Sequence, residues 1–406
     1  MVIGVMTHLL VVGGIASVHE VARRLGAELT LVKTGAAQTM LAPDAYARII
    51  DVSTHEHRDR VDLADEVTKA VLGTTFDGML CLHDEAVELG ALIAQELGLS
   101  FPSPGVAHRT SNKSAMRAWL DVAGLGSVAH GVVVDGKVEW SGLAPTSEIV
   151  LKPVDGRASR GVTFHRSAVE LQTWLDDHRG EVEGYLAEER KLGREFSVES
   201  LIVRSGDAWH GVTAKTTIGA VESGHLHPAP LEATERTRIM DAATTCLAAL
   251  GVDRGLLHTE VILDDAGAAH VIETHLRGGG DNILDLVRSS TGLDLAELYV
   301  RDVLEGVGEI PESTDLGFAS SQFAFPVEAG VISGWDGVEE ARSMPGVDLV
   351  TTLLNVGEQV SLEVNSSYGR SVCALAHSDN PVEACERARI AALTPRPILG
   401  SAQWFL

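Results

Sequence analysis

The order of the expected secondary-structure elements changes near residue 105, and this change limits the folds that the chain can adopt. Before that point, short apolar runs alternate with amphipathic stretches, which is typical of a parallel sheet with helices on both faces. From Gly131 onward, short strands follow one another through turns rich in Gly and Asp, which indicates antiparallel α+β structure. Pro102 and Pro104 lie between the two regions and indicate a domain boundary.

The same pattern places the individual elements. In the first region we expect strands at residues 2–6, 28–32 and 78–82 and helices at residues 17–25, 62–72 and 85–97. In the second region we expect helices at residues 112–122, 236–250 and 381–392, and strands at residues 131–134, 148–153, 161–165, 195–203, 209–213, 257–263, 269–274, 321–325 and 347–354.

Length and charge restrict the protein further. The 406 residues exceed what one core usually supports, so two or three domains are expected. The 57 acidic residues outnumber the 32 basic ones, and the net charge of −25 argues against nucleic-acid and membrane partners. The four cysteines form no CxxC motif, and no apolar run is long enough to span a bilayer. These features predict a soluble cytoplasmic protein with reduced thiols.

Residues 258–277 predict a hairpin that carries two facing carboxylates. If Ala266 and Gly267 form a two-residue turn, Glu260 lies directly opposite Glu273. Two carboxylates at about 5 Å repel each other, and a divalent cation such as Mg²⁺ would neutralise them. The strand alternation also places Glu273, His275 and Arg277 on one face, so that a cation site and an anion site adjoin. From this segment alone, an exposed face on which each glutamate pairs with an arginine is an equal alternative.

A second segment has the composition of a phosphate-binding loop. Lys152 ends an apolar strand, and residues 155–161 after it are rich in Gly and Ser and include Arg157 and Arg160. Such a loop can present successive backbone N–H groups to phosphate oxygens. It is not a Walker A loop, because no GKS or GKT follows and the next element is expected to be a strand. Taken alone, the segment also fits an ordinary hairpin turn.

Taken in order, these motifs resemble those of the ATP-grasp superfamily, and within it the L-amino-acid ligase-like carboxylate–amine ligases. The resembling segments are residues 112–120, 152–161, 187–199, 258–277 and the terminal segment from residue 318. The resemblance covers essentially the whole chain. It implies an N-terminal Rossmann-like (pre-ATP-grasp) α/β domain at residues 1–106 and a two-lobed ATP-grasp domain at residues 107–310 with a mobile lid at about 130–190. A C-terminal α+β ligase domain at residues 311–406 completes the expected organisation.

The resemblance also implies roles for the matched residues. ATP would be bound by Lys113, Lys152, Lys215, the loop residues Gly156, Ser159, Arg160 and Gly161, the adenine-lining Glu188, Glu189 and Arg190, and the ribose-binding Glu195. Mg²⁺, or Mn²⁺ in its place, would be held by Glu260 and Glu273. Arg277, which would steady the carboxylate or acyl-phosphate, forms the implied catalytic set with Lys215 and His225.

Residues 222–230 resemble a ligase loop that helps to form the substrate pocket. The implied substrate-binding residues are Glu222, His225, His227, His258, His275, Arg277 and Gly279. We expect at least one of His225, His227 and His258 to have a structural hydrogen-bonding role. His275 stands where many family members have Asn, and Mg²⁺ prefers oxygen ligands. His275 is therefore expected to contact a metal ligand or substrate, or to leave its place to water, and Asp281 is another candidate oxygen donor.

The implied reaction is the ATP-dependent joining of amino acids through an acyl-phosphate, with a peptide or γ-glutamyl bond formed and ADP and phosphate released. A homodimer is also implied. Three alternatives compete with this hypothesis. An ATP-grasp carboxylase would need a very small acid pocket, and a nucleotide-binding regulatory protein would show no turnover. An NAD-binding Rossmann protein would need the GxGxxG fingerprint, which Gly13-Gly14 does not complete.

Overall fold

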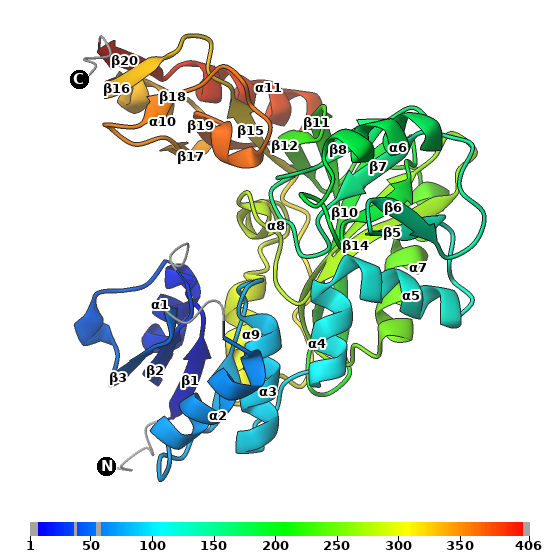
Figure 1. Ribbon diagram of the computed structural model, residues 1–406. Helices are drawn as coiled ribbons and strands as arrows, with labels where there is room; N and C mark the ends of the chain where they lie inside the picture. The colour runs from blue at the N-terminus through cyan, green and yellow to red at the C-terminus, as the bar shows by residue number, and fades with distance from the viewer. Residues whose placement is uncertain (1–6, 36–38, 54–57, 401–406) are drawn as a thin grey trace, which may run out of the picture.

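The computed structural model of the chain describes residues 7–35, 39–53 and 58–400. The strands form four sheets, which lie in an N-terminal part, a central part and a C-terminal part (Figure 1). The described helices are all too short or too polar to cross a membrane.

The N-terminal part is built on a parallel sheet with the order β3-β2-β1-β4, as the strand–helix alternation predicted. Its elements are β1 (His8–Val12), α1 (Ala16–Arg24), β2 (Glu28–Lys33), the 3-10 turn η1 (Pro43–Ala45), β3 (Arg48–Asp51), α2 (Arg60–Ala70), β4 (Gly78–Leu80) and α3 (Val87–Leu97). The strand expected at residues 2–6 lies outside the described residues. Apolar side chains cover both faces of the sheet, with α2 and α3 on one face and α1 on the other. Because β1 has β2 on one side and β4 on the other, the carboxyl ends of β1 and β4 form a crevice where ligands usually bind.

The prolines expected to break the chain instead introduce a helix. Pro104 occupies the first turn of α4 (Pro104–Ser111), where a missing N–H is tolerated, and Ser103 accepts a hydrogen bond from the N–H of Val106. Helix α5 (Lys113–Val122) follows directly and is capped by the side chain of Asn112. The predicted domain limit at residue 106 therefore falls within α4.

The central part begins with an antiparallel sheet of order β6-β5-β9-β7-β8. Its elements are β5 (His130–Val134), β6 (Lys137–Trp140), β7 (Ile149–Lys152), β8 (Thr163–His165), α6 (Ala168–Asp177) and β9 (Leu186–Glu189). Helix α6 packs on one face of this sheet through Leu171 and Leu175, which contact the buried Ile149 and Leu151. The sheet thus has a small core of its own.

The largest sheet has eight strands in the order β14-β13-β10-β11-β12-β15-β19-β17 and continues from the central part into the C-terminal part. Its central elements are β10 (Arg194–Ile202), β11 (Ala208–Ile218), β12 (Val221–His227), α7 (Ala233–Leu250), β13 (Gly255–Leu263), β14 (Ala269–His275), α8 (Ile283–Thr291) and α9 (Leu295–Leu304). Residues 222–230 were expected to form a loop, and this expectation is wrong up to His227. His225 pairs with Lys215 on β11 and with Ser321 on β15, so strand pairing on both sides overrides the turn signals of Gly224 and Pro228.

The C-terminal part adds three strands to this sheet and has a small sheet of order β18-β16-β20. Its elements are β15 (Phe318–Ala324), β16 (Gly330–Asp336), α10 (Val338–Arg342), β17 (Val347–Thr352), β18 (Gln359–Val360), the 3-10 turn η3 (Ser367–Gly369), β19 (Val372–Ser378), α11 (Pro381–Leu393) and β20 (Arg396–Gly400). Because β15 pairs directly with β12, the C-terminal part is fixed beside the central sheet, as Figure 1 shows.

Candidate active site

The predicted carboxylate pair is present: Glu260 on β13 lies opposite Glu273 on β14. The turn differs from the prediction. The N–H of Asp264 donates to the carbonyl of Ala268, so the turn contains three residues, 265–267, rather than two. An irregularity in the ladder next to Glu260 shifts the register back by one residue. The two deviations cancel, and the pairing of the glutamates is as expected.

Each of these glutamates forms an ion pair with a lysine. Lys215 Nζ lies 2.6 Å from Glu260 Oε1, and Lys113 Nζ lies 2.9 Å from Glu273 Oε2. Burial alone would raise the pKa of both carboxyls, but the lysines hold each pKa well below its usual range. The alternative of an exposed face with glutamate–arginine pairs is therefore wrong. The two glutamates and two lysines form a partly buried cluster of ionised groups with negative and positive charges.

Lys152 and Glu188 form a second buried pair at the junction of the two central sheets. Lys152 Nζ lies 2.5 Å from one Glu188 oxygen, and the guanidinium of Arg117 on α5 contacts the other. Arg117 also donates to the carbonyls of Val271 and Ile272, at 2.8 and 3.0 Å, and so anchors α5 on β14. The sequence analysis did not identify Arg117. Its only signal was its position one turn after Lys113 on the same helix.

The other residues predicted to line the adenine lie apart from this buried pair. Glu189 contacts Lys191 at 2.8 Å, and Arg190 contacts Glu148 at 2.7 Å and stacks on the ring of Phe164. The ion pairs of Glu189 and Arg190 therefore involve neither Lys152 nor Glu188.

The glycine loop, defined as residues 155–161, crosses between separate parts of the molecule. Arg157 forms an ion pair with Glu85 of the N-terminal part, and Ser159 Oγ donates to the carbonyl of Ala220 at 2.6 Å. Ala158 and Ser159 both have positive φ angles, of 51° and 59°, which are uncommon for residues other than glycine. Arg160 is exposed to solvent. The loop is therefore held in a strained conformation by contacts on both of its sides.

Glu273, His275 and Arg277 gather at one place, as the alternation predicted. His275 Nε2 lies 3.3 Å from Glu273 Oε1. Asp84, at the carboxyl end of β4, joins them: its Oδ1 accepts a hydrogen bond from Arg277 Nε at 2.7 Å and lies 3.4 Å from His275 Nδ1. Burial would raise the pKa of Asp84, but Arg277 and His275 hold it well below its usual range. Asp84 was not predicted, although its place after a parallel strand was a signal.

His258 is held by a carboxylate that the sequence analysis did not single out. Its Nδ1 lies 2.7 Å from Oε1 of the fully buried Glu199, whose Oε2 accepts the N–H of Gly279 at 3.0 Å. Burial alone would lower the pKa of His258, but Glu199 raises it to about 9. Glu199 thus fixes both the imidazole and the glycine-rich segment that follows Arg277.

His225 and His227 have different surroundings, although both belong to β12. His225 is buried with its Nε2 3.4 Å from Asp281, whereas the Nδ1 of His227 lies 2.7 Å from the hydroxyl of Ser290 on α8. The ligand atoms of Glu222, His225 and Asp281 lie within 4.8 Å of one another. Glu222 is already paired with Lys215 and Asp281 with two nitrogens of Arg370, so we assign no metal to this group.

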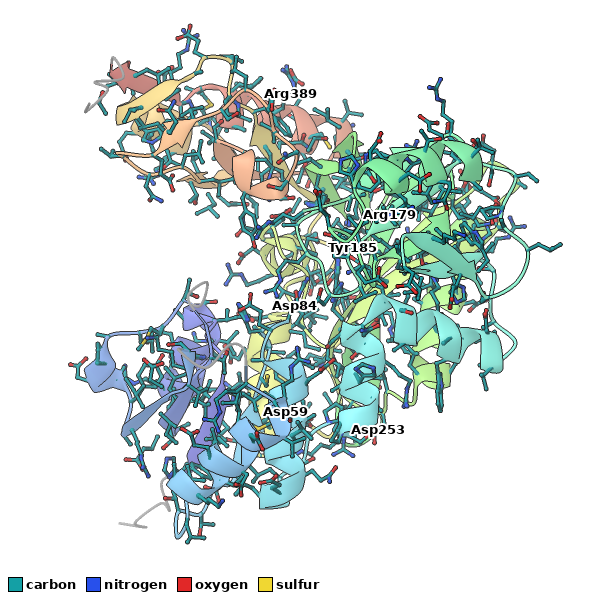
Figure 2. The ribbon with its side chains drawn as sticks, in the orientation of Figure 1. Asp59, Asp84, Arg179, Tyr185, Asp253 and Arg389 are labelled. Carbon is teal, nitrogen blue, oxygen red and sulfur yellow. The ribbon has the colours of Figure 1, made fainter. Side chains whose placement is uncertain are left out.

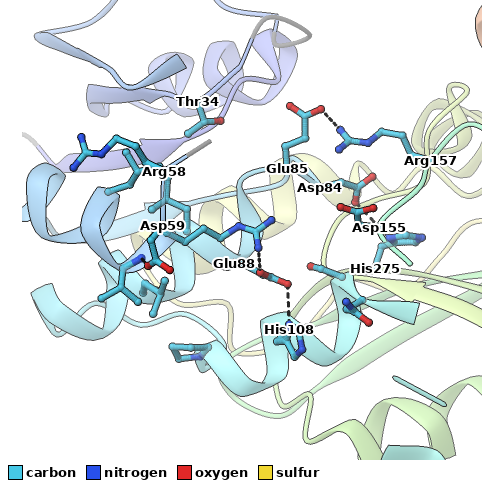
Figure 3. Close-up of a pocket in the computed structure, with 18 of the residues that line it drawn as sticks. Thr34, Arg58, Asp59, Asp84, Glu85, Glu88, His108, Asp155, Arg157 and His275 are labelled. Atoms are coloured by element: carbon cyan, nitrogen blue, oxygen red, sulfur yellow. Dashed lines mark hydrogen bonds and ion pairs between the residues drawn. The ribbon is translucent and has the colours of Figure 1, made fainter. Parts of the chain in front are cut away.

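These residues surround two connected hollows. One, of about 700 Å³, is lined among others by the predicted residues Ser159, Glu195, Lys215, Glu222, His258, Glu260, Glu273, His275, Arg277 and Gly279. The other, of about 910 Å³, contains Lys113 and Gly156 and shares Asp84, Arg157 and His275 with the first. Figure 3 shows this second hollow, with Arg157 directed at Glu85. Asp84 marks the meeting point near the middle of the molecule (Figure 2). Eight of the predicted site residues line neither hollow: Lys152, Glu188, Glu189, Arg190, Arg160, Gly161, His225 and His227.

Two segments of the chain match known protein families. Residues 146–285 match the family described as ATP-grasp domain, and residues 322–394 match the family described as L-amino acid ligase C-terminal domain 2. The alanine–anticapsin ligases of Bacillus subtilis and Bacillus amyloliquefaciens are each 24% identical over 282 residues. The match spans 62% of this chain and 59% of the length of these relatives.

Solved structures show the same architecture. An L-amino acid ligase from Bacillus licheniformis has a TM-score of 0.82 and 23% identity, over 97% of this chain and 99% of that one. A phosphoribosylglycinamide synthetase from Anaerococcus prevotii has a TM-score of 0.72 and 14% identity, over 97% of this chain and all of that one (100%). The mixed α/β and α+β fold is thus an ATP-grasp fold, as predicted. The chain thus has the fold of these proteins, with a match to an ATP-grasp domain at residues 146–285 and a match to an L-amino acid ligase C-terminal domain at residues 322–394.

Proposed function

We propose that the protein is an ATP-dependent carboxylate–amine ligase that joins two amino acids through an acyl-phosphate and releases ADP and phosphate. The observation that carries this proposal is the pair Glu260 and Glu273, with Lys113, Lys215 and Arg277 around it in the two connected hollows, which we together call the groove. A site with both carboxylates and cations suits the metal-bound triphosphate of ATP together with a carboxylate substrate.

The residues at the carboxylate pair fit a divalent cation. Glu260 and Glu273 offer oxygen ligands from a hairpin, and both are ionised at neutral pH because their pKa values are strongly lowered. We assign Mg²⁺ to this pair, with Mn²⁺ as a substitute, because hard cations prefer oxygen donors. When bound, the metal neutralises charge on the phosphates. His275 contacts Glu273 rather than offering a third oxygen, so it orients that carboxylate.

The cations of the groove offset the repulsion between two anions. A carboxylate oxygen of the first amino acid bonds to the γ-phosphorus, and the bond from that phosphorus to ADP breaks. Lys215 and Arg277, which line the smaller hollow, stabilise the charge on the transferring phosphoryl group and the carboxylate. The amine nitrogen of the second amino acid then attacks the acyl carbon, loses a proton, and phosphate leaves as the C–O bond breaks.

The acyl-phosphate must be kept from water, and the glycine loop is suited to this task. It lies between the two hollows and contacts Glu85 on one side and Ala220 on the other. A loop that closes over the site excludes water and preserves a reactive intermediate. Glu222 and Asp281 line the same hollow as Arg277, and their carboxylates would bind the ammonium group of the activated amino acid.

The comparisons support this reading over the alternatives. The C-terminal match is to a ligase domain, and the curated relatives are named as ligases that use alanine. Neither family match is to a carboxylase or to a regulatory nucleotide-binding protein. The amide formed by this chain is a peptide bond or a γ-glutamyl bond, according to which carboxylate of the first amino acid is activated.

The proposal is tested by product analysis. The protein is incubated with ATP, Mg²⁺ and pools of amino acids, while phosphate release and condensed products are measured by mass spectrometry. We expect a product lighter by one water than the sum of two amino acids, formed together with ADP. Phosphate release that does not depend on amino acids, with no condensed product in any pool, would contradict the proposal.

A further inference from the structure

A short turn of the C-terminal part reaches into the groove. This C-terminal turn, defined as residues 366–370, contains the 3-10 turn η3 and follows β18. Ser367, Tyr368 and Arg370 line the smaller hollow together with the metal-binding pair. Tyr368 is 59% exposed, whereas Arg370 is only 5% exposed. A segment from a different part of the chain therefore completes the wall of the site.

The C-terminal turn contacts three separate segments. The N–H of Ser367 donates to the carbonyl of Ala158 in the glycine loop at 3.2 Å. Arg370 donates to both oxygens of Asp281, at 2.7 and 2.6 Å, and to the carbonyl of Glu222 on β12 at 3.3 Å. One turn thus touches the loop predicted to cover ATP and the segment that follows Arg277.

Arg370 is held rigidly in this position. Its guanidinium lies over the ring of Phe323 on β15, 3.8 Å from the ring centroid, and its Nε donates to the carbonyl of Ser367 at 2.9 Å. A planar guanidinium with two parallel bonds to one carboxylate fixes the orientation of that carboxylate, which a lysine cannot do. Arg370 therefore sets the position of Asp281.

Asp281 occupies an unusual backbone conformation. Asp281 and Asn282 both have positive φ angles, of 55° and 62°. Two successive non-glycine residues in the left-handed region persist only where surrounding contacts impose them, and such strain clusters at functional sites. The ion pair with Arg370 supplies that constraint. We define residues 277–282 as the substrate loop, because Arg277 begins it and Asp281 lies near its end.

We infer that the C-terminal turn couples closure of the glycine loop to the placement of the substrate loop, with Arg370 as the positioning residue. This inference rests on the proposed ligase function. Closure of the glycine loop onto Ser367 holds the C-terminal turn, and Arg370 in turn holds Asp281 against the amino-acid site. Water is excluded and the substrate loop is placed in one movement.

The first experiment measures how well ATP use is coupled to ligation. In Arg370→Ala we expect the amount of condensed product per phosphate released to fall about tenfold, with a smaller change in the KM for ATP. Arg370→Lys, which keeps the charge but not the two parallel bonds, should recover part of the ratio. Arg389→Ala is the matched control, because Arg389 is an exposed arginine of α11 that pairs with Glu386. An unchanged product-to-phosphate ratio in a folded Arg370→Ala protein would overturn the inference.

The second experiment does not require ligation. Hydrogen exchange is measured with Mg²⁺ and the non-hydrolysable analogue AMP-PNP and without amino acids. In the wild type we expect slower exchange in both the glycine loop and the substrate loop, and in Arg370→Ala in the glycine loop alone. Asp281→Asn, which removes the charge but keeps the shape, should behave in the same way. Equal slowing of both loops in both variants, or no slowing of the substrate loop in the wild type, would overturn the inference.

The two experiments separate this inference from the proposed function. If the wild type slows exchange in both loops but forms no condensed product, the ligase assignment fails while the coupling of the loops holds. If the wild type ligates amino acids with an unchanged ratio in every variant, the function holds and the coupling fails.

Discussion

The two ends of the groove are built in different ways. At the nucleotide end, each charged pair lies within the central part of the chain. These pairs are Lys113–Glu273 and Lys215–Glu260. At the acid end, three ion pairs join the central part to another part: Arg157–Glu85 and Arg277–Asp84 reach the N-terminal part, and Asp281–Arg370 reaches the C-terminal part.

This difference indicates how the two ends respond to motion between the parts. Pairs within one sheet and its helices keep their geometry whatever the orientation of the neighbouring parts. Pairs between parts exist only when those parts are correctly docked, and removing one partner of a buried pair leaves an uncompensated charge. We therefore expect changes at the nucleotide end to affect chemistry, and changes at the acid end to affect the use of amino acids.

The largest effect is expected at the nucleotide end. Glu273→Gln keeps the shape of the side chain but removes the charge that would hold the metal. A bound metal ion would stabilise the charge of the transition state by several kcal/mol. We expect kcat to fall about a thousandfold, with an unchanged circular-dichroism spectrum. Glu339→Gln, at an exposed position of α10, serves as the control. Near-normal turnover by Glu273→Gln would show that this pair does not bind the metal.

A smaller effect is expected at the acid end. Asp84→Asn leaves Arg277 without its charged partner and removes the contact with His275. Because misplacement of a positioning group costs up to about a hundredfold, we expect kcat/KM for the activated amino acid to fall by about 10- to 100-fold. The KM for ATP should stay within about twofold of the wild-type value, as measured by initial rates. An equal rise in both KM values would remove the distinction between the two ends.

Two neighbouring glycines of the substrate loop provide a matched pair. A Cβ at Gly279 would lie 2.9 Å from Glu199 Oε2 and 3.0 Å from His258 Nδ1, whereas a Cβ at Gly280 would meet no atom within 4 Å. We expect Gly279→Ala to destabilise the protein by about 1–3 kcal/mol and to lower activity about tenfold, because the crowded groups must move. Gly280→Ala should be close to wild type. Equal melting temperatures and equal activities of the two variants would contradict the described packing.

The smallest effect on activity concerns histidines outside the groove, which act on stability. Burial lowers the pKa of His19 and of His227 to about 4, below the value of 6.5 expected in the unfolded chain. The unfolded chain therefore binds more protons between pH 4 and 6.5. The stabilisation is complete above pH 6.5 and is lost as the pH falls toward 4, by up to about 3 kcal/mol for each histidine. Urea unfolding at pH 7.5 and 5 measures this loss.

The histidine prediction has a direct control. His19→Gln should reduce the pH dependence, whereas His377→Gln, at an exposed site that contacts Asp348, should not. A pH dependence that is the same in His19→Gln as in the wild type would contradict the assignment of His19. The comparison also distinguishes the effect of low pH on the stability of the fold from its effect on the residues of the groove.

The carboxylate pair could be predicted from the sequence because its two residues are close along the chain. Glu260 and Glu273 belong to one hairpin, and their pairing survived an incorrect turn because a ladder irregularity compensated for the longer turn. The parallel sheet and most central strands also followed from alternation of apolar residues. His227 has the structural hydrogen-bonding role expected for at least one histidine, since it contacts Ser290.

The acid end could not be predicted because its partners are distant in sequence. Asp84 and Arg277 are separated by 193 positions, and Asp281 and Arg370 by 89, and no local spacing relates them. Strand β12 was expected to be a loop because residues 222–230 resemble a substrate-pocket loop of the ligases, whereas pairing with β11 and β15 decides its structure. Tertiary contacts therefore determine what local propensity leaves open.

The central claim is that an acyl-phosphate is formed, and oxygen-isotope transfer tests it most directly. An amino acid that the product analysis identifies as a substrate is labelled with ¹⁸O in its carboxylate and incubated with the protein, ATP and Mg²⁺. The account predicts that one ¹⁸O atom appears in each phosphate released, because the carboxylate oxygen bonded to phosphorus leaves with it. Condensed product accompanied by unlabelled phosphate would contradict the account.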